Sequence, residues 1–126
     1  MIIKINLDEL LTIFQDIIRI DKDVGPVVST DINLNVLNDS EKIVFTLLTK
    51  KLTYLLGFAS QETATVYEVQ KDVKTKSAGA LISMMIPEKL IQNIAAPGKK
   101  GEYRITDYGI DWVIKKVLPK LEKRNT

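Results

Sequence analysis

The sequence predicts a mainly α-helical protein with one small β-hairpin. Over several stretches, apolar residues recur at intervals of three and four, which is the spacing of amphipathic helices. The Pro97-Gly98 step and Gly101 bracket two lysines between short extended runs, which is typical of a hairpin turn. Thr106 follows the alternating residues 102–105 and has the side chain of a helix N-cap.

The composition restricts the classes of function. The 126 residues suit one domain, and 45% hydrophobic with 27% charged residues is a globular composition. The chain has neither cysteine nor histidine, which excludes disulfides, thiolate or imidazole metal sites and the nucleophilic systems built on either residue. It also lacks a phosphate loop, paired catalytic carboxylates and a metal-ligand cluster, so we expect neither an enzyme nor a cofactor or metal.

Two further features concern location and charge. No apolar run reaches the ~18 residues of a membrane span and the first residues lack the pattern of a signal peptide, so we expect a cytoplasmic protein without membrane contact. Residues 1–60 hold six Lys/Arg and eight Asp/Glu, a balance of −2, whereas residues 61–126 hold twelve and eight, a balance of +4. The basic half includes the hairpin and permits an acidic partner such as nucleic acid.

Residues 1–37 are predicted to form an N-terminal helix and its extension. Asn6 and Glu9 have capping-box spacing, and apolar residues share one face of a helix over residues 7–20. That helix either packs on its own domain or serves as a dimerisation arm. Residues 21–26 are predicted to form a turn, and the alternation of apolar residues with asparagine over residues 32–36 predicts a short strand.

Residues 38–122 are predicted to begin with three helices. Asn38 and Glu41 have capping-box spacing before a helix of about residues 40–56, which Gly57 ends. A second capping box, formed by Thr65 and Glu68, precedes a short helix that ends in a turn at residues 72–74. Thr75 is expected to cap the third helix, and Pro87 to end it. Two short helices joined by a tight turn make a helix-turn-helix.

The hairpin and a last helix complete the prediction. Residues 90–94 form the outgoing strand, and a helix starts at about residue 107, with Pro119 expected to kink or break it near Leu118. A helix-turn-helix followed by a basic hairpin and another helix is the order of a winged helix-turn-helix, here with an extra N-terminal helix.

Four runs of residues resemble the winged helix-turn-helix transcription regulators of archaea and bacteria of the MarR and PadR type. The runs are residues 65–71, 75–81, 88–91 and 98–109. With the helix before them and the helix after them, the resemblance covers roughly residues 38–118. The most specific is Tyr-Arg-Ile-Thr-x-x-Gly at residues 103–109, which in that family ends the wing and opens the next helix. The resemblance implies a homodimeric double-stranded DNA-binding protein whose third helix enters the major groove.

The resemblance also implies which residues contact DNA. The start of the third helix and the wing tip would do so, and basic residues nearby join them because residues 70–104 hold seven basic and three acidic side chains. The expected DNA-binding residues are Lys71, Lys74, Thr75, Lys76, Ser77, Ser83, Lys99, Lys100 and Arg104.

The outer face of the third helix departs from the usual pattern. It consists of Lys76, Gly79, Ala80, Ser83 and Pro87, without the arginine, asparagine or glutamine that read bases. Two functions therefore stay open. One is a transcriptional regulator that holds DNA mainly through its phosphates, and the other is a protein-protein interaction module of a transcription or replication complex.

The only tryptophan, Trp112, predicts a second surface. It lies about 200° from Ile110 around the last helix, away from the apolar stripe of that helix. Either the N-terminal helix covers it within one subunit, or the N- and C-terminal helices form a two-fold interface. For the homodimer, the expected interface residues are Leu7, Leu10, Leu11, Phe14, Ile17, Ile18 and Trp112.

Overall fold

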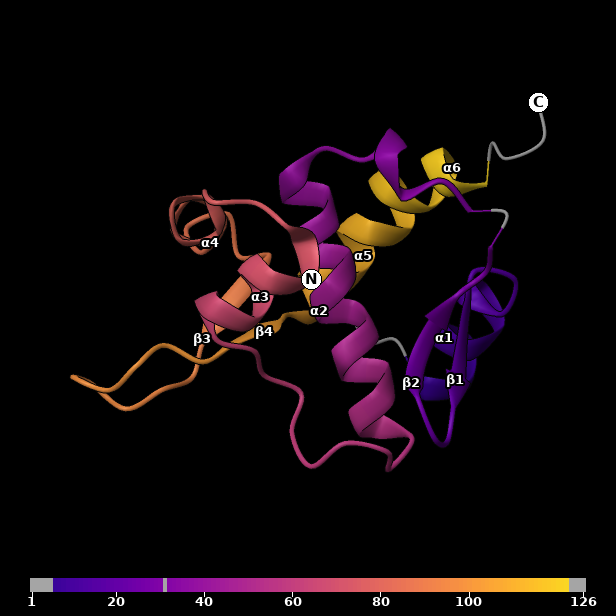
Figure 1. Ribbon diagram of the computed structural model, residues 1–126, viewed down its shortest axis with the longest axis horizontal. Helices are drawn as coiled ribbons and strands as arrows, with labels where there is room; N and C mark the ends of the chain where they lie inside the picture. The colour runs from indigo at the N-terminus through magenta and orange to yellow at the C-terminus, as the bar shows by residue number, and fades with distance from the viewer. Residues whose placement is uncertain (1–5, 31, 123–126) are drawn as a thin grey trace.

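The helix α2 (Asp39–Leu55) lies at the centre of the computed structural model, which describes residues 6–30 and 32–122. The predicted capping box is confirmed, since the Asn38 side chain accepts the Glu41 N–H and the Glu41 carboxylate accepts the Asn38 N–H, both at 2.8 Å. The helix ends before Gly57, which has a φ of +85°. Helices and small sheets pack around α2, so the fold is mixed α and β (Figure 1).

The prediction of one helix over residues 7–20 is wrong beyond Phe14. Instead, α1 (Leu7–Phe14) is followed by β1 (Ile18–Asp21), which pairs antiparallel with β2 (Gly25–Val28). The turn predicted at residues 21–26 is confirmed at residues 22–24, between the two strands, whereas Asp21, Gly25 and Pro26 belong to the strands. Asp21 Oδ1 accepts the N–H groups of Asp23 and Val24 at 2.8 and 3.1 Å, and Gly25 has a φ of +98°. This turn and the β-branched residues beside it favour a hairpin over a longer helix.

The predicted strand at residues 32–36 is also wrong. Residues Leu34–Val36 form the short 3-10 helix η1, and the Asn33 side chain accepts the Asn35 N–H at 3.0 Å. Asparagine competes for local backbone donors in this way, so an alternating pattern that contains it does not stabilise a strand.

The next two helices follow their predicted order. α3 (Val66–Val73) has the predicted capping box between Thr65 and Glu68. α4 (Ala78–Met85) ends just before Pro87, but it starts three residues later than Thr75. The prediction that Thr75 caps α4 is wrong, because its hydroxyl accepts the Ser77 N–H in the preceding turn.

The one hairpin that the sequence predicts is confirmed, and it is the second of the two in the structure. β3 (Ile91–Asn93) pairs antiparallel with β4 (Tyr103–Ile105). At the tip, the Lys99 N–H donates to the Ala96 carbonyl at 3.0 Å, and Gly98 has a φ of +80°, as a Pro-Gly turn requires. Two backbone hydrogen bonds of 2.9 Å also join Ala64 to Tyr103, which adds an isolated bridge on the other side of β4.

The C-terminal helix changes its winding along its length. It comprises α5 (Asp107–Trp112), the π-helical segment η2 (Val113–Val117) and α6 (Leu118–Leu121). The helical segments follow one another without a gap from Asp107 to Leu121, so the predicted break near Leu118 is wrong and a kink there stays a prediction. Pro119 lies at the start of α6 and has no N–H for the carbonyl four residues earlier. The π-turn absorbs the change in register just before it.

The Tyr-Arg-Ile-Thr-x-x-Gly run has a packing explanation. The Thr106 hydroxyl accepts the Gly109 N–H at 2.8 Å and caps α5, while the Thr106 N–H donates to the Leu90 carbonyl at 3.1 Å. This brings the first turn of α5 against Leu90, the residue just before β3. A Cβ atom on Gly109 would overlap the Leu90 carbonyl oxygen and lie 2.8 Å from Ile105 Cγ1. Position 109 therefore requires glycine.

Replacing Gly109 by alanine should lower the free energy of unfolding by roughly 1–3 kcal/mol, because the new methyl group overlaps backbone that cannot move freely. Gly79→Ala is the matched control, since its Cβ would meet only Val66 Cγ1 at an ordinary 3.6 Å. That change should be neutral or stabilise the helix by up to about 1 kcal/mol. Urea unfolding of both variants is the measurement, and equal stabilities would contradict the packing explanation.

Candidate nucleic-acid interface

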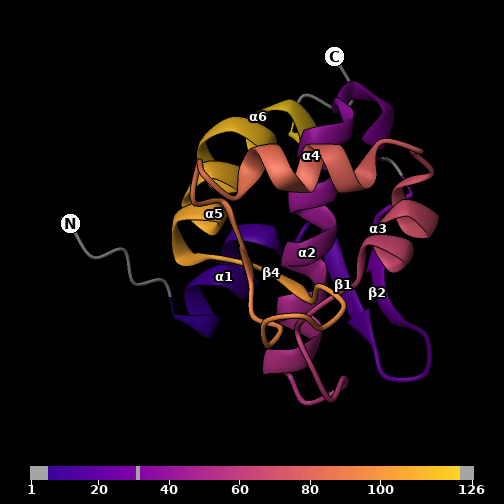
Figure 2. The same cartoon turned by 90° about the vertical axis from the view of Figure 1, so that its left-hand side faces the viewer.

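Most of the predicted basic residues lie on neighbouring elements. Lys71 and Lys74 belong to α3 and its C-terminus, Lys76 to the turn before α4, and Lys99 and Lys100 to the tip of the β3–β4 hairpin. All five side chains are exposed. None of them forms an ion pair with another residue of the described ranges 6–30 and 32–122. Figure 2 shows α3, α4 and the hairpin on the side of the molecule turned to the viewer.

The predicted polar residues of α4 differ in accessibility. Ser77 and Ser83 are exposed, whereas Thr75 is only 8% exposed and uses its hydroxyl to hold the turn before the helix. Thr75 therefore positions the start of α4 and offers little surface to a partner.

Arg104 is already engaged within the protein. Its Nε and Nη2 atoms donate to Gln92 Oε1, directly across the hairpin, at 3.2 and 3.1 Å. Its Nη1 lies 3.8 Å from Glu62 Oε1, and that oxygen is 3.5 Å from Lys51 Nζ. The guanidinium thus ties the hairpin to the loop between α2 and α3, so Arg104 positions the hairpin in the structure.

The hairpin tip is braced by further contacts. Asn93 Oδ1 accepts the N–H groups of Ala95 and Glu102 at 3.0 and 3.2 Å, which closes the loop beyond the paired strands. The Tyr103 ring lies so close to Gly101 that a side chain there would overlap it. The two lysines at the tip are therefore presented on an ordered turn.

The carboxylate of Glu68 belongs to the same helix as Lys71. Glu68 Oε2 is 3.8 Å from Lys50 Nζ. The hydrogen bond from the Thr65 N–H, the Lys50 charge and, more weakly, the Lys100 charge hold the pKa of Glu68 below its ordinary value, although burial opposes them.

The outer face of α4 offers little hydrogen-bonding capacity, as its sequence indicates. Ala80, Ser83 and Pro87 are exposed on it, and the neighbouring Met84 is 65% exposed. The outer face of α3 is different. It presents Tyr67 and Gln70, which are both exposed and which the sequence analysis does not single out. The signal that could have found them is their i, i+3, i+4, i+7 spacing with Lys71 and Lys74.

The predicted dimer residues are largely used inside the chain. Leu10, Phe14, Ile17 and Ile18 are buried in the core, and Leu7, Leu11 and Trp112 are partly buried against it. The N-terminal segment thus packs on its own domain, which was one of the two interpretations of its sequence. A homodimer stays a prediction. Of its expected interface residues, Leu7, Leu11 and Trp112 are the ones that keep part of their surface accessible to a second subunit.

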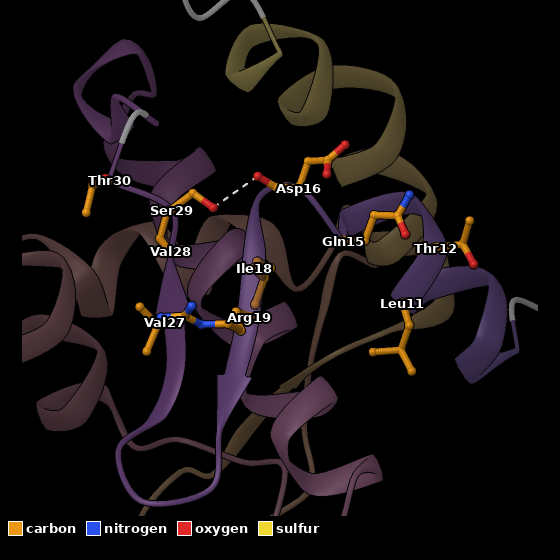
Figure 3. Close-up of a pocket in the computed structure, with 10 residues that line it drawn as sticks. All are labelled: Leu11, Thr12, Gln15, Asp16, Ile18, Arg19, Val27, Val28, Ser29 and Thr30. Atoms are coloured by element: carbon orange, nitrogen blue, oxygen red, sulfur yellow. Dashed lines mark hydrogen bonds between the residues drawn. The ribbon is translucent and has the colours of Figure 1, made fainter.

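A groove of about 760 Å³ lies on the other side of the molecule, between α1 and the β1–β2 hairpin (Figure 3). Leu11, Ile18 and Val28 contribute apolar surface to it, and Arg19 contributes a charge. The Ser29 hydroxyl at its rim donates to the Asp16 carbonyl at 3.0 Å. The groove does not include any of the predicted DNA-binding residues.

Within the described part of the chain, no three acidic side chains gather into a metal-binding group, and no helix is long and apolar enough to cross a membrane. Comparisons with protein-family models, with curated proteins and with solved structures found no match to this chain.

The low pKa of Glu68 makes its contribution to stability depend on pH. A carboxylate with a lowered folded-state pKa stabilises the protein above its unfolded pKa and loses that effect as the pH falls through the two values. Glu68→Gln keeps a side chain that suits the capping box but lacks the charge. It should cost about 0.5 kcal/mol at pH 7 and nothing near pH 3, as measured by urea unfolding at both pH values. An equal cost at both would contradict this account.

The role of Arg104 is tested by backbone exchange in the hairpin. Arg104→Met removes both bonds to Gln92 and the contact with Glu62. Amide hydrogen exchange at Tyr103 and Ile94 should become roughly fivefold to tenfold faster, which corresponds to about 1 kcal/mol of local stability. Lys99→Met is the control and should leave these rates unchanged. Unchanged rates in Arg104→Met would show that the residue does not hold the hairpin.

Proposed function

We propose that this chain is a double-stranded DNA-binding protein of the winged-helix type, a transcriptional regulator that holds DNA mainly through phosphate contacts. The observation that carries this proposal is the set of five exposed lysines on α3, the following turn and the hairpin tip, none of which forms an ion pair with a described residue. Lysines that are free of carboxylate partners and distributed over adjacent elements suit a polyanion.

The arrangement of elements supports the same proposal. Helix α2, the α3–α4 pair, the β3–β4 hairpin and α5 follow each other in the order of a winged helix. Ala64, in the segment before α3, pairs with Tyr103 of β4 through an isolated bridge. This residue thus occupies the place of a third strand beside the hairpin. In this proposal α4 lies at the major groove and the hairpin tip lies along the backbone.

Selectivity among DNA sequences should be weak in this proposal. Apart from Lys76, the side chains on the outer face of the third helix cannot form the bidentate pairs that distinguish bases. Differences between sites would arise from the shape and deformability of the duplex.

A second candidate function rests on a different observation. Met84 is 65% and Ile86 36% exposed near the end of α4, which suits a partner protein in a transcription or replication complex better than it suits phosphate. The two candidates differ in their response to salt, because only DNA binding releases the counterions of a polyanion.

Fluorescence anisotropy with a random duplex over a salt series tests the proposal. The Lys99→Ala, Lys100→Ala double variant should bind all sequences more weakly, and its slope of log affinity against log salt should fall by about 2. Lys22→Ala, Lys116→Ala is the control, with the same loss of charge on exposed residues outside the proposed interface.

A double variant with wild-type affinity and slope would remove the hairpin tip from the interface. Absence of binding by the wild type at low salt would reject DNA binding and favour the protein partner.

A further inference from the structure

The outer side of α3 carries a stripe of polar side chains. At 100° per residue, Tyr67, Gln70 and Lys71 fall within an arc of about 100° on α3, and Lys74, the residue that ends the helix, continues their spacing; all four are exposed. We call these four residues the α3 stripe. The valines of α3 project on the side facing the other helices, and Val69 is completely buried.

The charge on α3 is separated around its axis. Both acidic residues, Glu68 and Asp72, project to one flank of the α3 stripe, and Glu68 is occupied by the Thr65 cap and by Lys50. The stripe itself contains two ammonium groups, a phenol and an amide, and all four can donate hydrogen bonds. Such a set of donors suits the oxygen atoms of a phosphate backbone.

The backbone at Lys74 provides an independent observation. Lys74 has φ 61° and ψ 42°, in the left-handed region that favours glycine or asparagine, and its N–H closes α3 by donating to the Gln70 carbonyl at 2.8 Å. A glycine would adopt this conformation without strain. The chain instead has a lysine here, at a cost in stability that an exposed side chain does not repay by packing. Residues with such strain cluster at functional sites, although Lys89, outside the α3 stripe, also has a positive φ of 66°.

Resting on the proposed function, we propose that the α3 stripe is the main contact surface for duplex DNA and that α4, the expected recognition helix, lies at the major groove with few polar contacts. Lys71 and Lys74 contact phosphates, and Tyr67 and Gln70 donate to phosphate or sugar oxygens. The small residues on the outside of α4 allow the duplex to approach closely enough for α3 to reach it.

The decisive variants are two substitutions of Lys74. Lys74→Ala loses the charge and keeps the strain, whereas Lys74→Gly loses both. Both should weaken binding of a random duplex on the order of tenfold at low salt and lower the salt slope by about 1. Only Lys74→Gly should raise the midpoint of thermal unfolding, by about 3–5 °C.

Neutral donors are tested by Tyr67→Phe, which should weaken binding severalfold while the salt slope stays unchanged, because no charge is lost. Lys22→Ala is the control for loss of one exposed charge on another part of the protein and should match the wild type. The α3 stripe would be overturned, and the proposed function left intact, by one pattern of results. In it, Lys74→Ala, Lys74→Gly and Tyr67→Phe bind duplex DNA with wild-type affinity, while the Lys99→Ala, Lys100→Ala double variant binds it weakly. A wild type that binds no duplex would overturn both.

Discussion

The burial of α2 on nearly all sides is the constraint on which the other elements depend. Ile43, Val44, Leu47 and Leu48 are completely buried, and even Glu41 is only 5% exposed. A buried carboxylate without a partner is costly, so its second oxygen has to be neutralised, and Lys120 Nζ does so at 2.6 Å. This pair brings α6 back to the start of α2. The C-terminal helix must then reach from the hairpin to that point, and the π-turn and Pro119 lie along this path.

The same constraint decides which surfaces are left for a partner. α3, α4 and β4 all contact α2, so their apolar sides are used internally and their polar sides face outwards. The hairpin tip extends beyond this core and is ordered by local contacts, among them the Asn93 side chain and the bridge to Ala64. The lysines therefore lie on rigid elements, which lowers the entropic cost of ordering them when a partner binds.

Sequence reasoning succeeded where the signal was local. The capping boxes at Asn38 and Thr65, the turn at Gly98 and the N-cap at Thr106 each depend on residues within a few positions, and the structure has all four. It failed at residues 15–20, because adjacent apolar residues fit both the helical and the strand period and only the pairing with β2 distinguishes them. The five lysines of the candidate site were predicted from their charge together with the family resemblance, and the structure has all five exposed. The internal use of Arg104 depends on Gln92 and Glu62, which are far from it in sequence.

Lys74 shows where local rules and function diverge. Every neighbouring signal agrees with the fold: a capped helix, a tight turn and a buried apolar side. Only the lysine at the left-handed position conflicts with the local backbone, which favours glycine there. A sequence specifies its structure when local preferences and overall packing agree, so such a conflict is an exception. A lysine kept at that position costs stability in the free protein. The cost has a physical reason if the ammonium group gains more from a polyanion than the turn loses, and the α3 stripe is the surface on which that gain would arise.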